Sequence, residues 1–358
     1  MFDLALGLGQ GGVRITSEFQ SKFKVPAAYV NLSITDFSKF KAEGRKLNIE
    51  CGGTGRDPEL GFQFAKQNKG EILAFLDKLL TENTKRVLVC IGGGGGSGSG
   101  LSLIVLPYLV KKGKDVLVIY TLPEKKEKLP AKPNALKILN KLIERYLMQG
   151  SISMLLIDNE YCANRYSSSG SRFEGVNKAL PKIFNRFYRI TNLHDRHRYV
   201  DFSAGYNALD INELMRVLFF SKGFLDFRIF ELPPNAYNLQ ENELKKTIKT
   251  SSMFVGSFDI NTSKIALATI ALPLELKNNK KVSKLVDNLF VIIGKMTKAP
   301  YVFNSSYYDS IKNIRVNIIL GGLTKSKSLD SLIKQSLKDK ALLDNKASLE
   351  LLNLEGVM

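Results

Sequence analysis

The stretch Gly92-Gly-Gly-Gly-Gly-Ser-Gly-Ser-Gly100 lies between two apolar segments. Residues 86–91 form a short β-branched run typical of a buried strand, and residues 101–112 have the length and period of a helix. A glycine loop between a strand and a helix N-terminus lets an anion approach backbone N–H groups closely, and Ser97 and Ser99 add hydroxyl donors. The sequence therefore predicts a phosphate-binding loop.

A flexible glycine/serine linker has a similar composition. A linker between domains would normally have polar spacers on its two sides, and none are present here. The loop also lacks the lysine of the Walker pattern G-x-x-x-x-G-K-[ST], so it does not indicate an ordinary P-loop NTPase.

The composition of the 358 residues, 44% of them hydrophobic, indicates about two globular domains. No apolar run approaches the roughly 20 residues of a membrane span, and the first residues do not resemble a signal peptide, so we expect a cytoplasmic protein with no membrane partner. Three widely spaced cysteines indicate neither a disulfide framework nor a zinc site. The net charge of +18 admits nucleic acid, an acidic surface or a nucleotide as partner and does not choose among them.

A second glycine loop follows an apolar strand predicted over residues 2–8. It reads Gly7-Leu-Gly9-Gln10-Gly11-Gly12 and satisfies G-x-G-x-x-G. The motif fits a dinucleotide-binding turn, with Asp36 somewhat beyond the usual offset of a ribose ligand, and equally the first phosphate loop of another nucleotide fold. A further strand over residues 25–32 leads into polar residues 31–36, in which Asn31 and Asp36 are ligand candidates or only turn formers.

A third glycine-rich loop, residues 51–61, includes Gly55 and opens a helix at Pro58. Asp57 is placed to be the N-cap of this helix, and Pro58 suits its first turn. Asp57 could instead reach a phosphate-bound Mg²⁺ through water. The capping role is the simpler interpretation.

Strand and helix patterns alternate from residue 2 to residue 157, which predicts a parallel sheet covered on both faces with its loops gathered at one edge. Asp158-Asn159-Glu160 follows the last of these strands. Phe173 and Asn177 are four residues apart on the next helix, where a ring could stack on a base and a carboxamide could pair with its edge. Without that context, Phe173 would be an ordinary core residue.

Asp210 and Glu213 lie three residues apart in the first turn of a further predicted helix. Two carboxylates on one face can polarise a water molecule, and they can equally complement the dipole of a helix start. The only histidines, His194 and His197, lie in a basic segment and offer little material for a histidine-based triad.

Together these motifs resemble those of the tubulin/FtsZ superfamily, and most closely the TubZ group of plasmid- and phage-encoded partition GTPases. Residues 94–100 match the family motif G-G-G-[ST]-G-[ST]-G, with Ser97 where threonine is usual. The match continues in family order along most of the chain, through the loops at 7–12, 31–36 and 52–61.

The resemblance implies an α/β chain with a Rossmann-like GTP-binding domain built on a parallel sheet, a long central helix and a smaller mixed α/β C-terminal domain. The corresponding divisions are 1–172 for the GTP-binding domain, 173–212 for the central helix and synergy loop, 213–322 for the C-terminal domain and 323–358 for a helical tail.

The resemblance also implies a GTP/GDP site with Mg²⁺, in which Phe173 and Asn177 recognise guanine and Asp57 reaches the metal, through water. The implied nucleotide ligands are Gly9, Gln10, Gly11, Gly12, Asn31, Asp36, Gly55, Gly94, Gly95, Gly96, Ser97, Gly98, Ser99, Asn159, Phe173 and Asn177.

Asp210 and Glu213 are similar to the catalytic carboxylates of the family motif N-x-D-x-x-[DE], which act on the nucleotide of the adjacent subunit. Here one extra residue separates Asn207 from Asp210, and a competing alignment would use Asp201. Only Asp210 and Glu213 keep the D-x-x-E spacing.

A site completed by the next subunit implies a head-to-tail filament. The resemblance further implies plasmid or phage DNA segregation through a DNA-binding adaptor of the TubR type on centromere-like DNA, without sequence-specific DNA binding by the chain itself. The adaptor could contact the tail or the basic central segment, residues 182–198. Two other functions stay open: an NAD(P)-dependent oxidoreductase using the motif at 7–12, and a DNA-binding module driven by the charge of +18.

Overall fold

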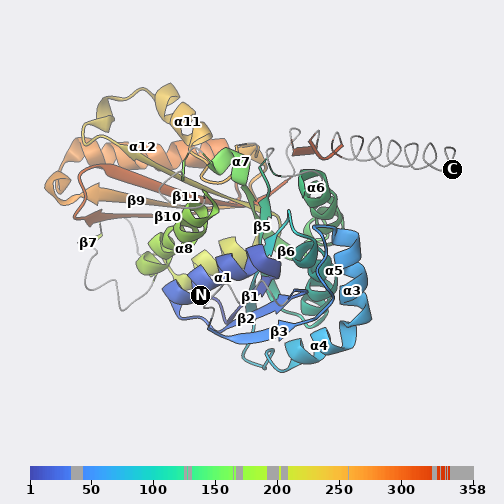
Figure 1. Ribbon diagram of the computed structural model, residues 1–358. Helices are drawn as coiled ribbons and strands as arrows, with labels where there is room; N and C mark the ends of the chain where they lie inside the picture. Colours follow the sequence, from blue (N-terminus) through green and yellow to red (C-terminus); the bar gives the residue numbers. More distant parts are fainter. Residues whose placement is uncertain are drawn as a thin grey trace.

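The computed structural model describes residues 1–33, 43–124, 127, 131–163, 165–166, 172–191, 201–202, 209–256, 258–324 and, with gaps, 329–338. Its framework is one sheet of eleven strands in the order β3-β2-β1-β4-β5-β6-β8-β11-β9-β10-β7 (Figure 1). The strands are β1 Leu4–Leu8, β2 Ala27–Asn31, β3 Arg45–Asn48, β4 Arg86–Gly92, β5 Asp115–Leu122, β6 Ile152–Asp158, β7 Asp201–Phe202, β8 Phe224–Leu232, β9 Ile265–Pro273, β10 Tyr301–Asp309 and β11 Ile314–Leu323.

Most of these strands point the same way. Strands β1 to β6 pair in parallel, and β6 continues in parallel into β8 through Met154 and Leu155. Because β11 is antiparallel to both β8 and β9, and β10 is parallel to β9, strands β8, β9 and β10 also share the direction of β1. The predicted parallel sheet is confirmed, and the four long C-terminal strands extend it.

Helices cover both faces of the sheet (Figure 1), as predicted. They are α1 Gly9–Phe23, α3 Pro58–Gln67, α4 Lys69–Asp77, α5 Gly96–Lys111, α6 Ala131–Leu142, α7 Asn159–Cys162, α8 Arg172–Thr191, α10 Ile211–Met215, α11 Glu241–Thr250 and α12 Lys280–Thr297. A π-helical turn, Arg216–Phe220, continues α10.

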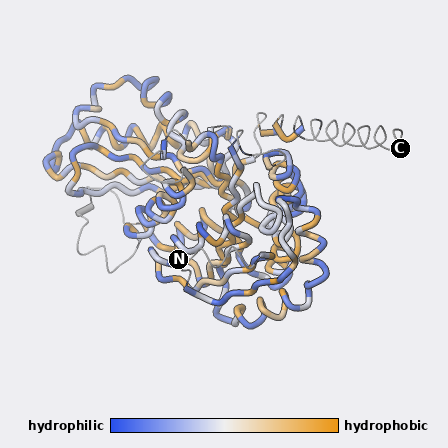
Figure 2. The backbone as a smooth tube through the Cα atoms, in the orientation of Figure 1, coloured by the Kyte–Doolittle hydropathy of each residue, from blue (hydrophilic) through white to orange (hydrophobic). Residues whose placement is uncertain are grey.

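The two faces hold two separate cores, because successive side chains of a strand point to opposite sides. On β4, Val87, Val89 and Ile91 join the core that contains α3 to α6 and α12, while Leu88 and Cys90 join the core of α1, α8 and α10. Figure 2 shows hydrophobic residues concentrated in the interior of the molecule and hydrophilic residues concentrated toward its periphery.

Within the second core, α8 packs directly on α1. Phe184 and Phe19 meet edge to face with ring centroids 5.3 Å apart, and both are fully buried. This contact holds α8 along α1, and residues near the starts of both helices, Gly9 and Phe173, line one cavity.

The predicted tail at 323–358, apart from its first residues and a few beyond 329, lies outside the described residues, as do Asp36, Asn207 and both histidines. Among the helices that the structure does describe, none combines the length and apolarity required to cross a membrane.

Candidate nucleotide site

A cavity of about 430 Å³ lies at the carboxyl ends of β1, β4, β5 and β6. Ligands of open parallel sheets bind at this edge, and the volume lies within the range of small-molecule sites. The lining residues are Leu8, Gly9, Gln10, Gly11, Arg14, Ile15, Thr54, Arg56, Gly92, Gly94, Gly95, Gly96, Ser97, Gly98, Thr121, Pro123, Glu127, Asn159, Phe173 and Asn177.

Two helices begin at this cavity, α1 at Gly9 and α5 at Gly96, and neither has a side-chain cap. The first N–H groups of a helix have no partner inside the helix, and the dipole makes its N-terminus positive. Here α1 and α5 both present such groups to the same space. The pair of N-termini therefore suits a ligand with several negative oxygens, such as a polyphosphate.

The two glycine loops touch each other at one point. A Cβ on Gly9 would lie 2.5 Å from the amide nitrogen of Gly98, and a Cβ on Gly98 would lie 2.5 Å from the carbonyl oxygen of Leu8. Gly9 also has φ of +65°, a conformation that other residues rarely adopt. Only glycine at these two positions lets the N-termini of α1 and α5 converge.

The two serines of the main loop have different surroundings. Ser97 lines the cavity and is available to a ligand, whereas Ser99 is fully buried and donates its hydroxyl to the carbonyl of Gly93 at 3.1 Å. We infer that Ser99 holds the loop in shape and that Ser97 is the serine hydroxyl that can meet a phosphate.

Two guanidinium groups, those of Arg14 and Arg56, add positive charge to the wall. Arg14 lies one helical turn after Gln10 on α1. Arg56 follows Gly55 in the third loop, and its Nη1 lies 3.8 Å from Oε2 of Glu127, the single acidic side chain among the described residues of the lining. Uncapped amides and two arginines against one carboxylate make the cavity selective for anions.

The opposite wall carries an aromatic ring and two carboxamides, Phe173 and Asn177 from the first two turns of α8 and Asn159 from the first residue of α7. These side chains offer a stacking surface and paired donors and acceptors. Asp158 precedes them and caps α7 by accepting from the amide of Glu160 at 3.0 Å; burial raises the pKa of Asp158.

Of the predicted nucleotide ligands, Gly9, Gln10, Gly11, Gly94, Gly95, Gly96, Ser97, Gly98, Asn159, Phe173 and Asn177 are brought together on the lining. Gly12, Asn31, Gly55 and Ser99 do not line it. Gly12 packs against β4, where a Cβ would lie 2.2 Å from the carbonyl oxygen of Cys90, and Asn31 is fully buried at the end of β2. Gly55 is exposed between two lining residues, and Asp36 lies outside the described residues.

Asp57 is the N-cap of α3, as its position before Pro58 predicts. Its Oδ1 accepts from the amides of Glu59 at 2.8 Å and Leu60 at 3.4 Å. In the described part of the chain, no group of three or more His, Cys, Asp or Glu residues is arranged to hold a metal ion. The described residues fit a Mg²⁺ ion that is held mainly by phosphate oxygens and water, with one or two protein carboxylates, which is how this ion usually binds beside a nucleotide.

Asp210 and Glu213 form a capping box at the start of α10. Asp210 Oδ1 accepts from the amide of Asn212 and Glu213 Oε2 accepts from the amide of Asp210, both at 2.8 Å. Asp210 is exposed and Glu213 half-buried. Neither lines the glycine-loop cavity.

The capping box lies at the other edge of the sheet. Residues of α10 and its π-helical continuation line a second cavity together with Ile265 and Tyr301, the first residues of β9 and β10. Close by, Lys222 Nζ lies 3.8 Å from the carboxylate of Asp115 at the amino end of β5. The carboxyl end of β5 contributes Thr121 to the glycine-loop cavity, six residues or about 20 Å away along the strand.

Sequence reasoning missed Arg14, Thr54, Arg56, Thr121 and Glu127 on the lining. Arg14 could have been found from its i+4 spacing to Gln10, and Arg56 as the only cation of the third glycine loop. Thr121 and Glu127 carry no local signal, because they reach the cavity only through the pairing of β4 with β5.

No protein-family model matches this sequence, and no curated protein matches it either. Solved structures do match over nearly the whole chain. A GTPγS-form protofilament of TubZ from Bacillus thuringiensis serovar israelensis has a TM-score of 0.76 at 17% identity, covering 98% of this chain and 94% of its own. The GTPγS-bound protofilament of CetZ2 from Haloferax volcanii has a TM-score of 0.72 at 21% identity, covering 95% and 99%. TubZ of Clostridium botulinum phage c-st has a TM-score of 0.65 at 18% identity, covering 95% and 98%.

The resemblance first drawn from the glycine motif thus extends to the arrangement of the whole chain, including the strands and helices that no motif covers. The chain has the tubulin/FtsZ fold, with solved TubZ and CetZ structures among its structural neighbours.

Proposed function

We propose that this chain binds GTP in the glycine-loop cavity, assembles head to tail into filaments and hydrolyses GTP to GDP at the junction between two subunits. The observation that carries the proposal is the placement of the anion-binding loops and of the Asp210–Glu213 pair at opposite edges of one sheet. The start of α10 lies next to the amino ends of β9 and β10, at the edge of the sheet opposite the glycine-loop cavity, so its carboxylates cannot act on the nucleotide of their own chain. Head-to-tail stacking would bring them to the site of the next chain.

In this arrangement the amides at the starts of α1 and α5, with Ser97 and Arg14, would hold the phosphates. Phe173, Asn177 and Asn159 would hold the base, and guanine is favoured by the family resemblance. Asp210 and Glu213 of the adjoining subunit would orient the attacking water and accept its proton. Mg²⁺, bound by phosphate oxygens and water with Asp57 reaching it through a water molecule, would neutralise part of the phosphate charge.

The structurally similar proteins support nucleotide binding and filament formation in general. The Bacillus thuringiensis TubZ and Haloferax volcanii CetZ2 structures are nucleotide-bound protofilaments, and TubZ is also known as a two-stranded helical filament, with a TM-score of 0.78 to this chain. The proposed site keeps the other predicted ligands as well. Those that are buried would act by shaping the loops. The residues are Gln10, Gly12, Asn31, Asp36, Gly55 and Ser99.

A complementation experiment tests the shared site. Asp210→Asn keeps a good N-cap and removes the charge, while Ser97→Asp places a negative charge at the phosphates; Ser97→Thr, the residue usual in the family, is the matched control. Each of the first two variants should lose about 100-fold or more in hydrolysis when alone. Mixed, they should regain activity, because a Ser97→Asp subunit can present its intact carboxylates to nucleotide held by an Asp210→Asn subunit.

Equal parts of the two variants in random order would restore at most about one active junction in four. Ser97→Thr should behave like the unmodified chain. A mixture as inactive as its components would contradict catalysis between subunits.

A thermal-shift comparison of GTP, ATP and NAD separates this function from the oxidoreductase alternative, which requires stabilisation by NAD.

The cellular role we propose is plasmid or phage DNA segregation by cytoplasmic filaments, through a TubR-type adaptor bound to centromere-like DNA. It rests on the likeness to the TubZ group, whose Bacillus thuringiensis structure matches with a TM-score of 0.76, against 0.72 for CetZ2 from Haloferax volcanii. Removing residues 324–358 should abolish recruitment of the adaptor and leave GTP binding intact. Unchanged recruitment would exclude the tail as the adaptor site.

A further inference from the structure

A buried ion pair lies on β8, away from both cavities. Arg228 Nη2 and Asp226 Oδ2 are 2.7 Å apart, and the two side chains are only 3% and 1% exposed. Burial raises the pKa of Asp226, and the charge of Arg228 opposes that shift. Removing two charges from water is costly unless their remaining hydrogen bonds are well satisfied, so the other partners of the pair indicate what it holds.

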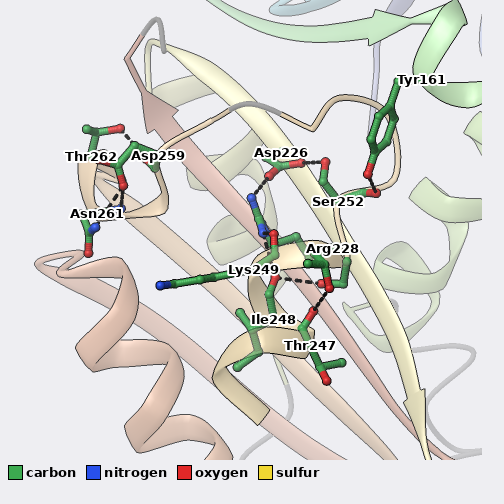
Figure 3. Close-up of polar contacts among 12 residues, drawn as sticks. Tyr161, Asp226, Arg228, Thr247, Ile248, Lys249, Ser252, Asp259, Asn261 and Thr262 are labelled. Carbon is green, nitrogen blue, oxygen red and sulfur yellow. Dashed lines mark hydrogen bonds and ion pairs between the residues drawn. The ribbon is translucent and has the colours of Figure 1, made fainter. Parts of the chain in front are cut away.

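Those partners belong to the last turn of α11 and to the chain that follows it (Figure 3). Arg228 Nη1 donates to the carbonyls of Ile248 and Lys249 in the last turn of α11, each at 2.7 Å, and Ser252 donates its hydroxyl to Asp226 Oδ1 at 2.6 Å. The backbone adds a bond from the amide of Met253 to the carbonyl of Phe227 at 2.8 Å. The pair thereby fixes residues 251–256, here named the joint segment, along β8.

The other side of the joint segment binds α7. Tyr161 donates its hydroxyl to the carbonyl of Ser252 at 3.0 Å (Figure 3), and the guanidinium of Arg165 donates to the same oxygen. The amide of Asp158 donates to the carbonyl of Phe254 at 3.0 Å. A Cβ on Gly256 would lie 2.9 Å from the ring of Tyr161, so the two pieces of chain are in close contact.

Helix α7 has four residues, and its first residue, Asn159, lines the nucleotide cavity. A helix this short has almost no stability of its own, so its position depends on what it is bonded to. One link between Asn159 and the buried pair has two short steps, from Tyr161 to Ser252 and from Ser252 to Asp226.

We propose that Asp226, Arg228 and Ser252 are positioning residues for the nucleotide site: they fix the joint segment, which sets where α7 holds Asn159 against the base. This inference rests on the proposed function, because it assumes a nucleotide in the cavity. The affinity of the nucleotide cavity for GTP then depends on three side chains from the C-terminal part of the chain. None of the three lines that cavity.

The test removes single hydrogen bonds from the path without altering the cavity lining. Tyr161→Phe deletes the side-chain bond from Tyr161 of α7 to the carbonyl of Ser252, Ser252→Ala deletes the bond to Asp226, and Ser252→Thr restores that hydroxyl. Tyr29→Phe is the matched control, since Tyr29 is also buried and hydrogen-bonded, to Gln20 Oε1 at 2.8 Å, but lies on β2 away from α7.

Two measurements are made on the full chain. Hydrogen exchange of a peptide covering residues 156–163, without nucleotide, should accelerate in Tyr161→Phe and Ser252→Ala and not in Tyr29→Phe or Ser252→Thr. The dissociation constant for GTP should rise about three- to tenfold in the same two variants, the effect of one hydrogen bond. A purely structural role would lower thermal stability without moving the affinity of the folded protein.

Unchanged exchange at 156–163 in both variants would overturn the link between the joint segment and α7. Faster exchange with unchanged GTP affinity would overturn the positioning of Asn159 while leaving GTP binding in place. Failure of the unmodified chain to bind GTP would instead refute the proposed function. The unmodified chain is measured first, so this outcome is distinct from an effect of a substitution.

Discussion

At the scale of single residues, the glycines of the site differ in what they permit. Gly9 and Gly98 allow the starts of α1 and α5 to meet, whereas a side chain on Gly52, Gly53 or Gly55 would meet nothing within 4 Å. The close approach of Gly9 to Gly98 therefore depends on the absence of a Cβ at both positions.

Gly9→Ala should weaken GTP binding at least about tenfold, because the methyl group must displace the amide of Gly98 and the residue must also tolerate a positive φ. Isothermal titration with GTP measures the effect. Gly294→Ala on α12, where a Cβ would meet nothing within 4 Å, is the control and should leave affinity unchanged. Normal affinity in Gly9→Ala would mean that the two helix starts do not act together on the ligand.

Asp3 gives a prediction for stability against pH. Burial acts to raise its pKa, but the amides of Arg86 and Lys85, at 2.8 Å and 2.9 Å, and the Arg86 guanidinium outweigh it and hold the pKa below its usual value. A lowered pKa in the folded state stabilises the protein above the unfolded pKa of about 3.9, and this contribution is lost as the pH falls through the folded pKa.

Asp3→Asn should therefore lower the free energy of unfolding by about 1 kcal/mol at pH 7, and the difference from the unmodified chain should shrink as the pH falls below about 4. Urea titrations at several pH values measure it. The control is Glu82→Gln, since Glu82 is exposed in a turn and should show little difference at any pH. A difference for Asp3→Asn that grows toward low pH would contradict this assignment.

At the scale of elements, the last glycine of the motif serves helix packing. A Cβ on Gly100 would lie 2.2 Å from the carbonyl carbon of Gly61 and 2.4 Å from the amide nitrogen of Phe62, so α5 and α3 cross with their backbones in contact. Gly100→Ala should cost about 1–3 kcal/mol of stability by forcing the helices apart. Chemical denaturation checks it, against Gly70→Ala on α4, where there is open space and a small gain is expected. Equal stability of the two variants would contradict the tight crossing.

The elements found from sequence are those whose burial shows in their own residues. The apolar runs that became β1, β2, β4 and β5, and the glycine loops after β1 and β4, were all predictable, because a strand buried on both faces is apolar throughout. The strand β10 was missed, since Asn304 and two following serines interrupt its pattern, although Ser305 and Ser306 are buried between neighbouring strands. Helix α11 was also missed, because only Leu244 and Ile248 mark its buried face.

The candidate site shows the same limit. Residues within the loops were predictable from local motifs, but α7 meets the joint segment across about ninety positions of sequence, as in the bond from Tyr161 to Ser252 with a separation of 91. No spacing rule covers such a contact. The family resemblance supplied the site residues along the chain, and only the fold brings the distant ones together.

At the scale of the whole molecule, shared-site hydrolysis predicts a dependence on protein concentration. Turnover per molecule should rise with concentration until most chains are in filaments, because the proposed catalytic carboxylates, Asp210 and Glu213, do not line the cavity of their own chain. Phosphate release measured over a hundredfold range of protein concentration tests this. Asp210→Asn should stay low throughout, and a constant turnover in the unmodified chain would contradict the shared site.

The common direction of the strands also matters for how a filament bears tension. Strands β1 to β6 and β8 to β10 run between the edge that holds the glycine loops and the edge that holds α10. A pull between neighbouring subunits would pass along covalent backbones, and the hydrogen bonds between strands would be loaded together in shear instead of opening one after another. In the proposed filament, the same strand geometry would let each subunit transmit tension along its backbone.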